Sequence, residues 1–156
     1  IPLHLQKSNM NEEQKHKFLM HFEKNDGWQL YFCVLGGMFA EGIDFRGERL
    51  IGAVIIGVGL PQINPESDFV RDHFNAQGTD GYHYAYTFPG MNKVLQAMGR
   101  VIRTKKDKGI LVLIDDRYAS PLYRSLMPPH YAHGRFIRNN LEIESLLTSF
   151  WNSSQD

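Results

Sequence analysis

Short apolar runs alternate with amphipathic stretches along this chain of 156 residues. Three runs rich in branched and aromatic residues, Leu30–Leu35, Ile51–Val58 and Ile110–Ile114, predict strands. The first run is apolar throughout, which is typical of a strand buried on both faces. Helical periodicity lies between and after the runs. This alternation indicates an α/β fold in which helices flank a doubly wound parallel sheet with right-handed crossovers.

The remaining elements are predicted from caps and periodicity. Asn11 is placed to cap a helix, and Gln14 stands at the reciprocal position of a capping box. Phe18, Leu19 and Phe22 recur on one side of that helix and predict its buried stripe. Four further elements are expected: a short strand at Pro2–Gln6, a helix near Pro65–Gln77, a short helix opened by Ser120-Pro121, and a last amphipathic helix at Leu141–Trp151.

A helix expected from about Asn92 to Thr104 separates apolar and cationic residues. At roughly 100° per residue, one side of this helix gathers Gln96, Gly99, Arg100 and Arg103. Arginine is always charged, and its planar fork suits phosphate oxygens. A glycine in the middle of a helix destabilises the helix by about 1 kcal/mol relative to alanine. A backbone or a ligand that approaches closely at Gly99 would explain why a glycine stands there. Taken alone, the pattern is typical of an amphipathic helix with a solvated basic face.

A glycine pair, Gly36 and Gly37, directly follows the apolar run Leu30–Leu35. Glycines at this place let the backbone turn sharply and come near a ligand. Two acids, Glu41 and Asp44, come next, at the end of the predicted sheet where open α/β folds bind ligands. In isolation this segment is more typical of an ordinary strand-to-helix loop with solvated acids.

Composition is that of a soluble globular domain, with 42% hydrophobic and 22% charged residues, and one domain spanning residues 1–156 is expected. The formal net charge is zero, so the chain as a whole has no bias toward polyanions. The single cysteine, Cys33, predicts a reduced thiol buried in a strand. Without a signal peptide or a long apolar run, a cytoplasmic protein without membrane contact is expected. The start at Ile1 suggests a piece of a larger protein.

Several other patterns predict no site. Gly57-Val-Gly59 lacks the third glycine of a dinucleotide loop, and His130 and His133 lack companion metal ligands. Asp115 and Asp116 end a strand, but no Walker A lysine accompanies them, so local hydrogen bonds or cross-domain contacts are expected. The alternation of Tyr82, Tyr84, Tyr86 and Phe88 with other residues favours a half-buried extended segment over a base-stacking platform.

The two glycine-containing motifs, in this order, resemble the second motor domain of superfamily 2 helicases, within the DinG/XPD group of ATP-dependent DNA helicases. Gly36–Phe45 is similar to motif V of that group, and Gln96–Arg103 is similar to its motif VI. The strand ending in Leu60-Pro61 and the Asp115–Arg117 segment resemble the intervening and following parts. The resemblance covers most of the chain and implies a RecA-like parallel sheet, truncated at its N-terminal edge.

The resemblance also implies roles for individual residues. Arg103 corresponds to an arginine finger on the γ-phosphate of ATP, and Arg100 and Gln96 correspond to further contacts near the phosphates. Asp44, Gly42 and Gly99 correspond to residues that bind nucleotide in the DinG/XPD helicases. Gly36, Gly37 and Glu41 belong to the loop that couples nucleotide state to single-stranded DNA.

The implied cofactors are ATP and Mg²⁺, bound mainly by an N-terminal motor domain that also becomes a partner of this chain. With one cysteine, this chain is not expected to hold an iron–sulfur cluster, and alone it is expected to be inactive. Two alternatives stay open: a non-catalytic RecA-like module that binds nucleic acid or protein, and a small α/β enzyme with a site around Asp115 and His130.

Overall fold

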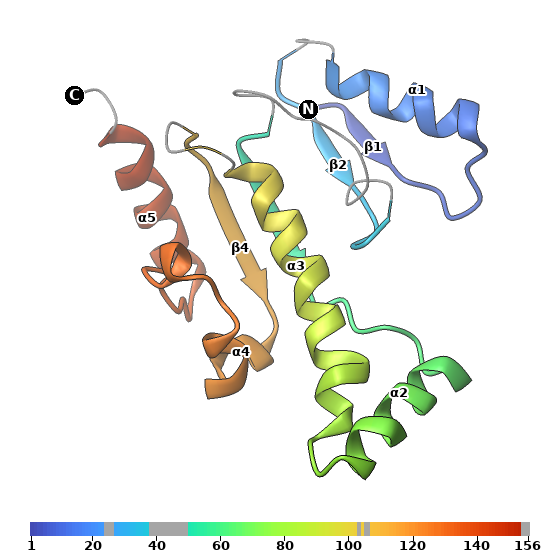
Figure 1. Cartoon of the computed structure of the whole chain (residues 1–156). Helices are drawn as coiled ribbons and strands as arrows, with labels where there is room; N and C mark the ends of the chain where they lie inside the picture. Colours follow the sequence, from blue (N-terminus) through green and yellow to red (C-terminus); the bar gives the residue numbers. More distant parts are fainter. Residues whose placement is uncertain (24–26, 38–49, 103, 105–106, 154–156) are drawn as a thin grey trace. The chain divides into compact units, whose positions relative to one another are not determined.

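The computed structural model describes residues 1–23, 27–37, 50–102, 104 and 107–153. These residues form two compact units, one from Ile1 to Tyr118 and one from Ala119 onward, and each is treated by itself. The first unit contains the described strands and helices of 12 to 14 residues; the second contains short helical turns and one helix of 13 residues (Figure 1). The prediction of a single domain over 1–156 stays a prediction.

The first unit begins with a strand, a helix and a second strand. Strand β1 (Leu3–Leu5) pairs in parallel with β2 (Leu30–Phe32), and α1 (Glu12–Glu23) connects them. The capping box of α1 is confirmed: the Gln14 amide donates to Asn11 Oδ1 at 2.9 Å, and the Asn11 amide donates to Gln14 Oε1 at 3.0 Å. Phe18 and Phe22 are buried, as predicted.

The burial predicted for β2 is wrong. Leu30 and Phe32 are both about half exposed, while Tyr31 between them stacks on Phe22 with ring centroids 3.6 Å apart. The described residues therefore cover only one face of this strand, because α1 packs on the Tyr31 side. Cys33 follows the strand and is exposed rather than buried in a sheet interior.

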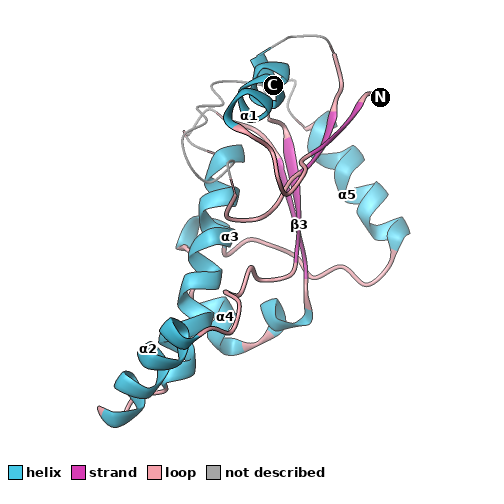
Figure 2. Cartoon of the chain, turned by 90° about the vertical axis from the view of Figure 1, so that its right-hand side faces the viewer, coloured by secondary structure: helices cyan, strands magenta, loops and turns pink. Residues whose placement is uncertain are grey.

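A second parallel pair of strands forms the other sheet of the first unit. Strand β3 (Gly52–Ile56) pairs with β4 (Ile110–Ile114), with Val54 opposite Val112. Helix α3 (Phe88–Val101) runs along this pair, as both views show (Figures 1 and 2). The parallel strands and flanking helices agree with the α/β class predicted from the sequence.

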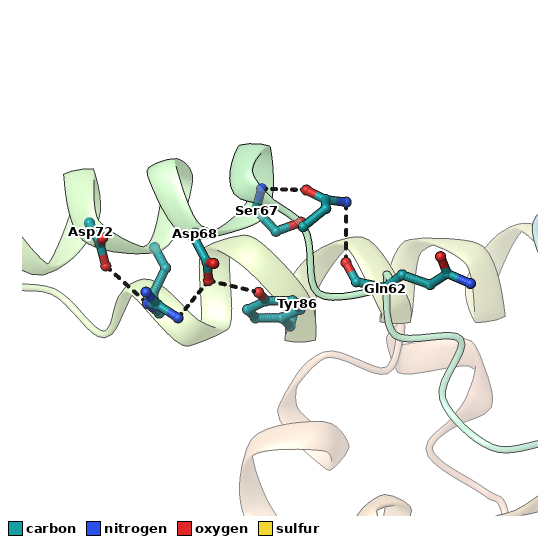
Figure 3. Close-up of polar contacts among 7 residues, drawn as sticks. Gln62, Ser67, Asp68, Asp72 and Tyr86 are labelled. Atoms are coloured by element: carbon teal, nitrogen blue, oxygen red, sulfur yellow. Dashed lines mark hydrogen bonds and ion pairs between the residues drawn. The ribbon is translucent and has the colours of Figure 1, made fainter.

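Between β3 and α3 the chain forms a helical arm. Helix α2 (Pro65–Ala76) is capped by Asn64, whose Oδ1 accepts from the Ser67 amide at 2.8 Å (Figure 3). A π-helix, η1 (His83–Thr87), then leads directly into α3. The extended segment predicted for Tyr82–Phe88 is therefore wrong. Two of these aromatic side chains contact α2: Tyr84 stacks on Phe74 with ring centroids 3.8 Å apart, and the Tyr86 hydroxyl donates to Asp68 Oδ1 at 3.4 Å.

The second unit follows the short 3-10 turn η2 (Asp116–Ala119). It contains α4 (Pro121–Ser125), the 3-10 turn η3 (Pro129–Tyr131) and α5 (Asn140–Asn152). Ser120 caps α4 and Asn139 caps α5, so the predicted starts of both helices are confirmed within one or two residues. The guanidinium of Arg124 lies 4.7 Å from the centre of the Phe136 ring, a cation–π contact inside this unit.

Candidate functional site

Helix α3 separates its buried and polar sides as the sequence predicts. Met91, Val94, Met98 and Val101 are each at most 4% exposed, and they face the sheet. Gln96 is exposed, and Gly99 and Arg100 are half-buried. Four fully buried residues fix the rotation of the helix, so the polar stripe is held on the side opposite the core.

The helix begins and ends earlier than predicted. It starts at Phe88 instead of Asn92 and ends at Val101, because Ile102 leaves the helix with φ −117° and ψ 103°. Of the four residues predicted on the stripe, Gln96, Gly99 and Arg100 lie in α3. Arg103 lies outside the described residues, as do Glu41, Gly42 and Asp44.

Gly99 leaves an open space on α3. A Cβ built at Gly99 meets no atom within 4 Å, apart from the helix's own backbone and its chain neighbours. No backbone of the described residues therefore approaches this glycine. Packing among the described residues therefore does not account for its helix-propensity cost of about 1 kcal/mol.

Gly90 has the opposite surroundings at the start of α3. A Cβ there would lie 2.6 Å from the carbonyl oxygen of Val58 and 3.3 Å from Cα of Leu60. The helix thus touches the backbone that follows β3, and this contact sets its position against the carboxyl end of that strand. Sequence reasoning gave Gly90 no role.

The glycine pair after β2 forms a tight turn. The Gly37 amide donates to the Val34 carbonyl at 3.0 Å, and Gly36 has φ +78°. A positive φ at the third residue of such a turn is typical of type II and favours glycine. Gln6, at the end of β1, supports the turn by accepting from the Val34 amide at 2.9 Å. The sharp turn predicted here is confirmed.

This turn lies against α3. A Cβ at Gly36 would be 2.8 Å from Cδ of Lys93, so the alkyl stem of Lys93 crosses the space that the glycine leaves. The start of the Gly36–Phe45 segment and the helix carrying Gln96 and Arg100 are therefore neighbours in one unit. The sequence pattern gave no indication of this contact between Lys93 and Gly36.

The patterns set aside in the sequence have local structural roles. Arg117 donates through Nε and Nη2 to the two carboxylate oxygens of Asp115, at 2.8 and 2.7 Å, and these bonds lower the pKa of Asp115 below its usual value. Asp115 is thus a local hydrogen-bond partner, one of the two roles predicted. Tyr118 donates its hydroxyl to the Gly57 carbonyl at 2.7 Å.

Neither a metal site nor a membrane span is found among the described residues. They contain no group of three or more His, Cys, Asp or Glu side chains arranged to bind a metal ion. No helix formed by these residues has the length and apolar character that crossing a bilayer requires.

Comparison with known proteins gives a consistent result. The family model described as "Helicase C-terminal domain" matches residues 2–140. A probable ATP-dependent helicase of Methanocaldococcus jannaschii is 29% identical over 92% of this chain and 22% of its own length. An ATP-dependent DNA helicase of Caenorhabditis elegans is 38% identical over 58% of this chain and 11% of its own length.

Two further similarities point the same way. The XPD helicase subunit of general transcription and DNA repair factor IIH from Dictyostelium discoideum is 35% identical over 61% of this chain and 12% of its own length. A solved structure of XPD without ligand superposes with a TM-score of 0.61 over 81% of this chain and 26% of that structure, at 21% identity, which is similarity of fold. The chain spans about a fifth or less of the length of these curated relatives.

Proposed function

This chain belongs to the helicase C-terminal domain family, and from that premise we propose that it is the second motor domain of an ATP-dependent DNA helicase of the XPD/DinG type, acting in DNA repair or replication. The proposal is supported chiefly by the contact between Lys93 and Gly36. This contact makes the turn that opens motif V a neighbour of the motif VI helix, the arrangement that coupling between a nucleic-acid strand and a nucleotide requires.

The chemistry assigned to the domain is limited to one part of ATP hydrolysis. Hydrolysis needs a phosphate cradle, a Mg²⁺ ion, a positioned water and positive charge at the γ-phosphoryl group. The sequence has no G-x-x-x-x-G-K-[ST] motif to form the cradle. We therefore assign the cradle and the Mg²⁺ ligands to a first motor domain, and the positive charge to this chain.

Three residues of motif VI supply that charge and its polar surroundings. Arg103 acts as the arginine finger on the γ-phosphate, Arg100 contacts a second phosphate oxygen, and Gln96 is a polar contact beside them. The exposed position of Gln96 and the open space at Gly99 support this assignment, because both leave the polar side of α3 accessible to a facing domain. Asp44 and Gly42 complete the nucleotide side of the interface.

The nucleic-acid side of the proposal rests on the Gly36–Gly37 turn. Backbone amides and short polar groups bind phosphates without reading bases. Gly36, Gly37 and Glu41 therefore contact single-stranded DNA independently of its sequence and transmit the nucleotide state to it.

The arginine finger is tested in a protein that contains this chain together with a first motor domain. Arg103→Ala should slow ATP hydrolysis by about 10³- to 10⁵-fold, because the charge that develops at the γ-phosphoryl group loses its partner. Phosphate release at saturating ATP and single-stranded DNA measures the effect, and Lys17→Ala on the surface of α1 is a matched control. Hydrolysis by Arg103→Ala within a few-fold of wild type would remove the proposed role.

A further inference from the structure

The alkyl stem of Lys93 packs against the Gly36–Gly37 turn in the unbound protein. Its Cγ, Cδ and Cε atoms would lie 3.2, 2.8 and 3.2 Å from a Cβ built at Gly36. The stem therefore rests on the bare backbone of the turn, where any larger residue would displace it. Fixing a lysine side chain in one conformation costs rotamer entropy. Because the stem of Lys93 is already packed in the unbound protein, less rotamer entropy is lost when its ammonium group binds a ligand.

The ammonium group of Lys93 has no carboxylate partner among the described residues. It lies one bond beyond Cε, close to the Gly36–Gly37 turn. Gly36 is exposed, and its amide donates to no acceptor in the part of the chain that the structure describes. A lysine cation and an open backbone N–H at a turn are two donors that phosphate groups commonly bind.

The position of Lys93 on α3 aligns it with the motif VI stripe. Lys93, Gln96 and Arg100 are spaced i, i+3 and i+7, so they share one side of the helix. Val94 and Met98, which are 0% and 2% exposed, fix the other side against the sheet. The cationic stripe therefore extends from Arg100 to the turn after β2.

We propose that Lys93 and the exposed backbone of the Gly36–Gly37 turn form a phosphate-binding subsite. Its ligand is a phosphate group, carried by the backbone of single-stranded DNA or by a nucleotide. The inference rests on the proposed helicase function and adds to it: Lys93 is a phosphate-binding residue at the point where motif V meets motif VI. Recognition is electrostatic, so it is independent of base sequence.

The test titrates a protein that contains this chain together with a first motor domain. One arm uses fluorescein-labelled dT12 followed by anisotropy, and the other uses a fluorescent ATP analogue. Lys93→Gln should weaken binding about tenfold in one arm, as expected when one charged hydrogen bond is lost. For dT12, the slope of log K against log salt should also fall by about 0.7, the value for one phosphate on a single strand. Lys93→Arg should retain most of the affinity, because it keeps the charge.

Lys17→Gln is the matched control. It removes the same charge from an exposed lysine of α1 that pairs with Glu13 at 2.7 Å. It should leave the affinities for dT12 and for the ATP analogue unchanged. Backbone amide NMR signals supply an independent readout: Gly36 and Gly37 should shift on titration of wild type, and should shift much less in Lys93→Gln. Circular dichroism of each variant verifies that the chain is folded.

The outcomes separate the two sources of phosphate. A loss confined to dT12 assigns the subsite to nucleic acid, and a loss confined to the ATP analogue assigns it to nucleotide. If Lys93→Gln binds both as wild type does while Arg100→Gln binds more weakly, the subsite is refuted and the proposed function stands. Binding of neither ligand by wild type would refute both.

Discussion

Two glycines of α3 have opposite surroundings: Gly99 faces open space and Gly90 is in close contact with a neighbouring backbone. We therefore expect alanine to have opposite effects on stability at these two positions. Gly99→Ala should raise the free energy of unfolding by up to about 1 kcal/mol, because the new methyl meets no atom within 4 Å and alanine favours the helix. Gly90→Ala should lower it by about 1–3 kcal/mol, because its Cβ would lie 2.6 Å from the Val58 carbonyl oxygen. Urea unfolding followed by circular dichroism measures both changes.

The same Gly99 variant also tests function. If the open space at Gly99 accommodates a facing domain or the nucleotide, Gly99→Ala should reduce DNA-stimulated ATP hydrolysis in the two-domain protein, although it stabilises the fold. Full activity together with higher stability would mean that Gly99 has no role at the interface. Stability and activity thus change in opposite directions only if the glycine serves an external contact.

At the level of single elements, the capping box of α1 supports a quantitative prediction. Asn11→Ala removes the acceptor for the Gln14 amide and should lower the free energy of unfolding by about 0.5–2 kcal/mol. Gln14→Ala removes the reciprocal bond to the Asn11 amide. A double-mutant cycle measured by chemical denaturation should give a coupling free energy of about 0.5 kcal/mol or more, since the two bonds share one helix end.

The control for this prediction is Asn92→Ala, which changes an exposed asparagine inside α3. Alanine is the better helix former, so this variant should be neutral or slightly stabilising. Additive effects of Asn11→Ala and Gln14→Ala, or a loss in Asn92→Ala equal to that in Asn11→Ala, would contradict the capping role.

Elements were predicted well where a local signal decided them. Asn11 and Ser120 cap helices through bonds to amides a few residues away, and such signals are readable in the sequence. Tyr82–Phe88 had no such signal. Aromatic residues at alternate positions fit an extended chain, and the π-helix depends on their packing against α2, which includes the stack of Tyr84 on Phe74.

For the whole molecule, the prediction concerns activity without a partner domain. The purified chain should release no phosphate from ATP above the rate of its Arg103→Ala variant, because no phosphate-binding loop is encoded in it. A first motor domain from the same protein, added in trans or joined to the chain, should restore hydrolysis. Turnover by the chain alone, clearly above that of the variant, would contradict the shared ATP site.

The sequence by itself determined the α/β class, most of the helices and the ordered pair of motifs, because these depend on local periodicity, caps and residue identity. It did not determine the exposure of β2. An apolar run records only that its side chains are apolar, and the covering layers decide whether both faces of the strand are buried.

Only the tertiary structure decided which residues meet. Two contacts join segments that are far apart in the chain: Lys93 contacts Gly36, and Gly90 contacts the backbone after β3. No local rule relates such positions, since their distance follows from the packing of α3 on the sheet through Val94 and Met98. Residue types thus specified the chemistry of the candidate site, and the folded core specified which groups can act together.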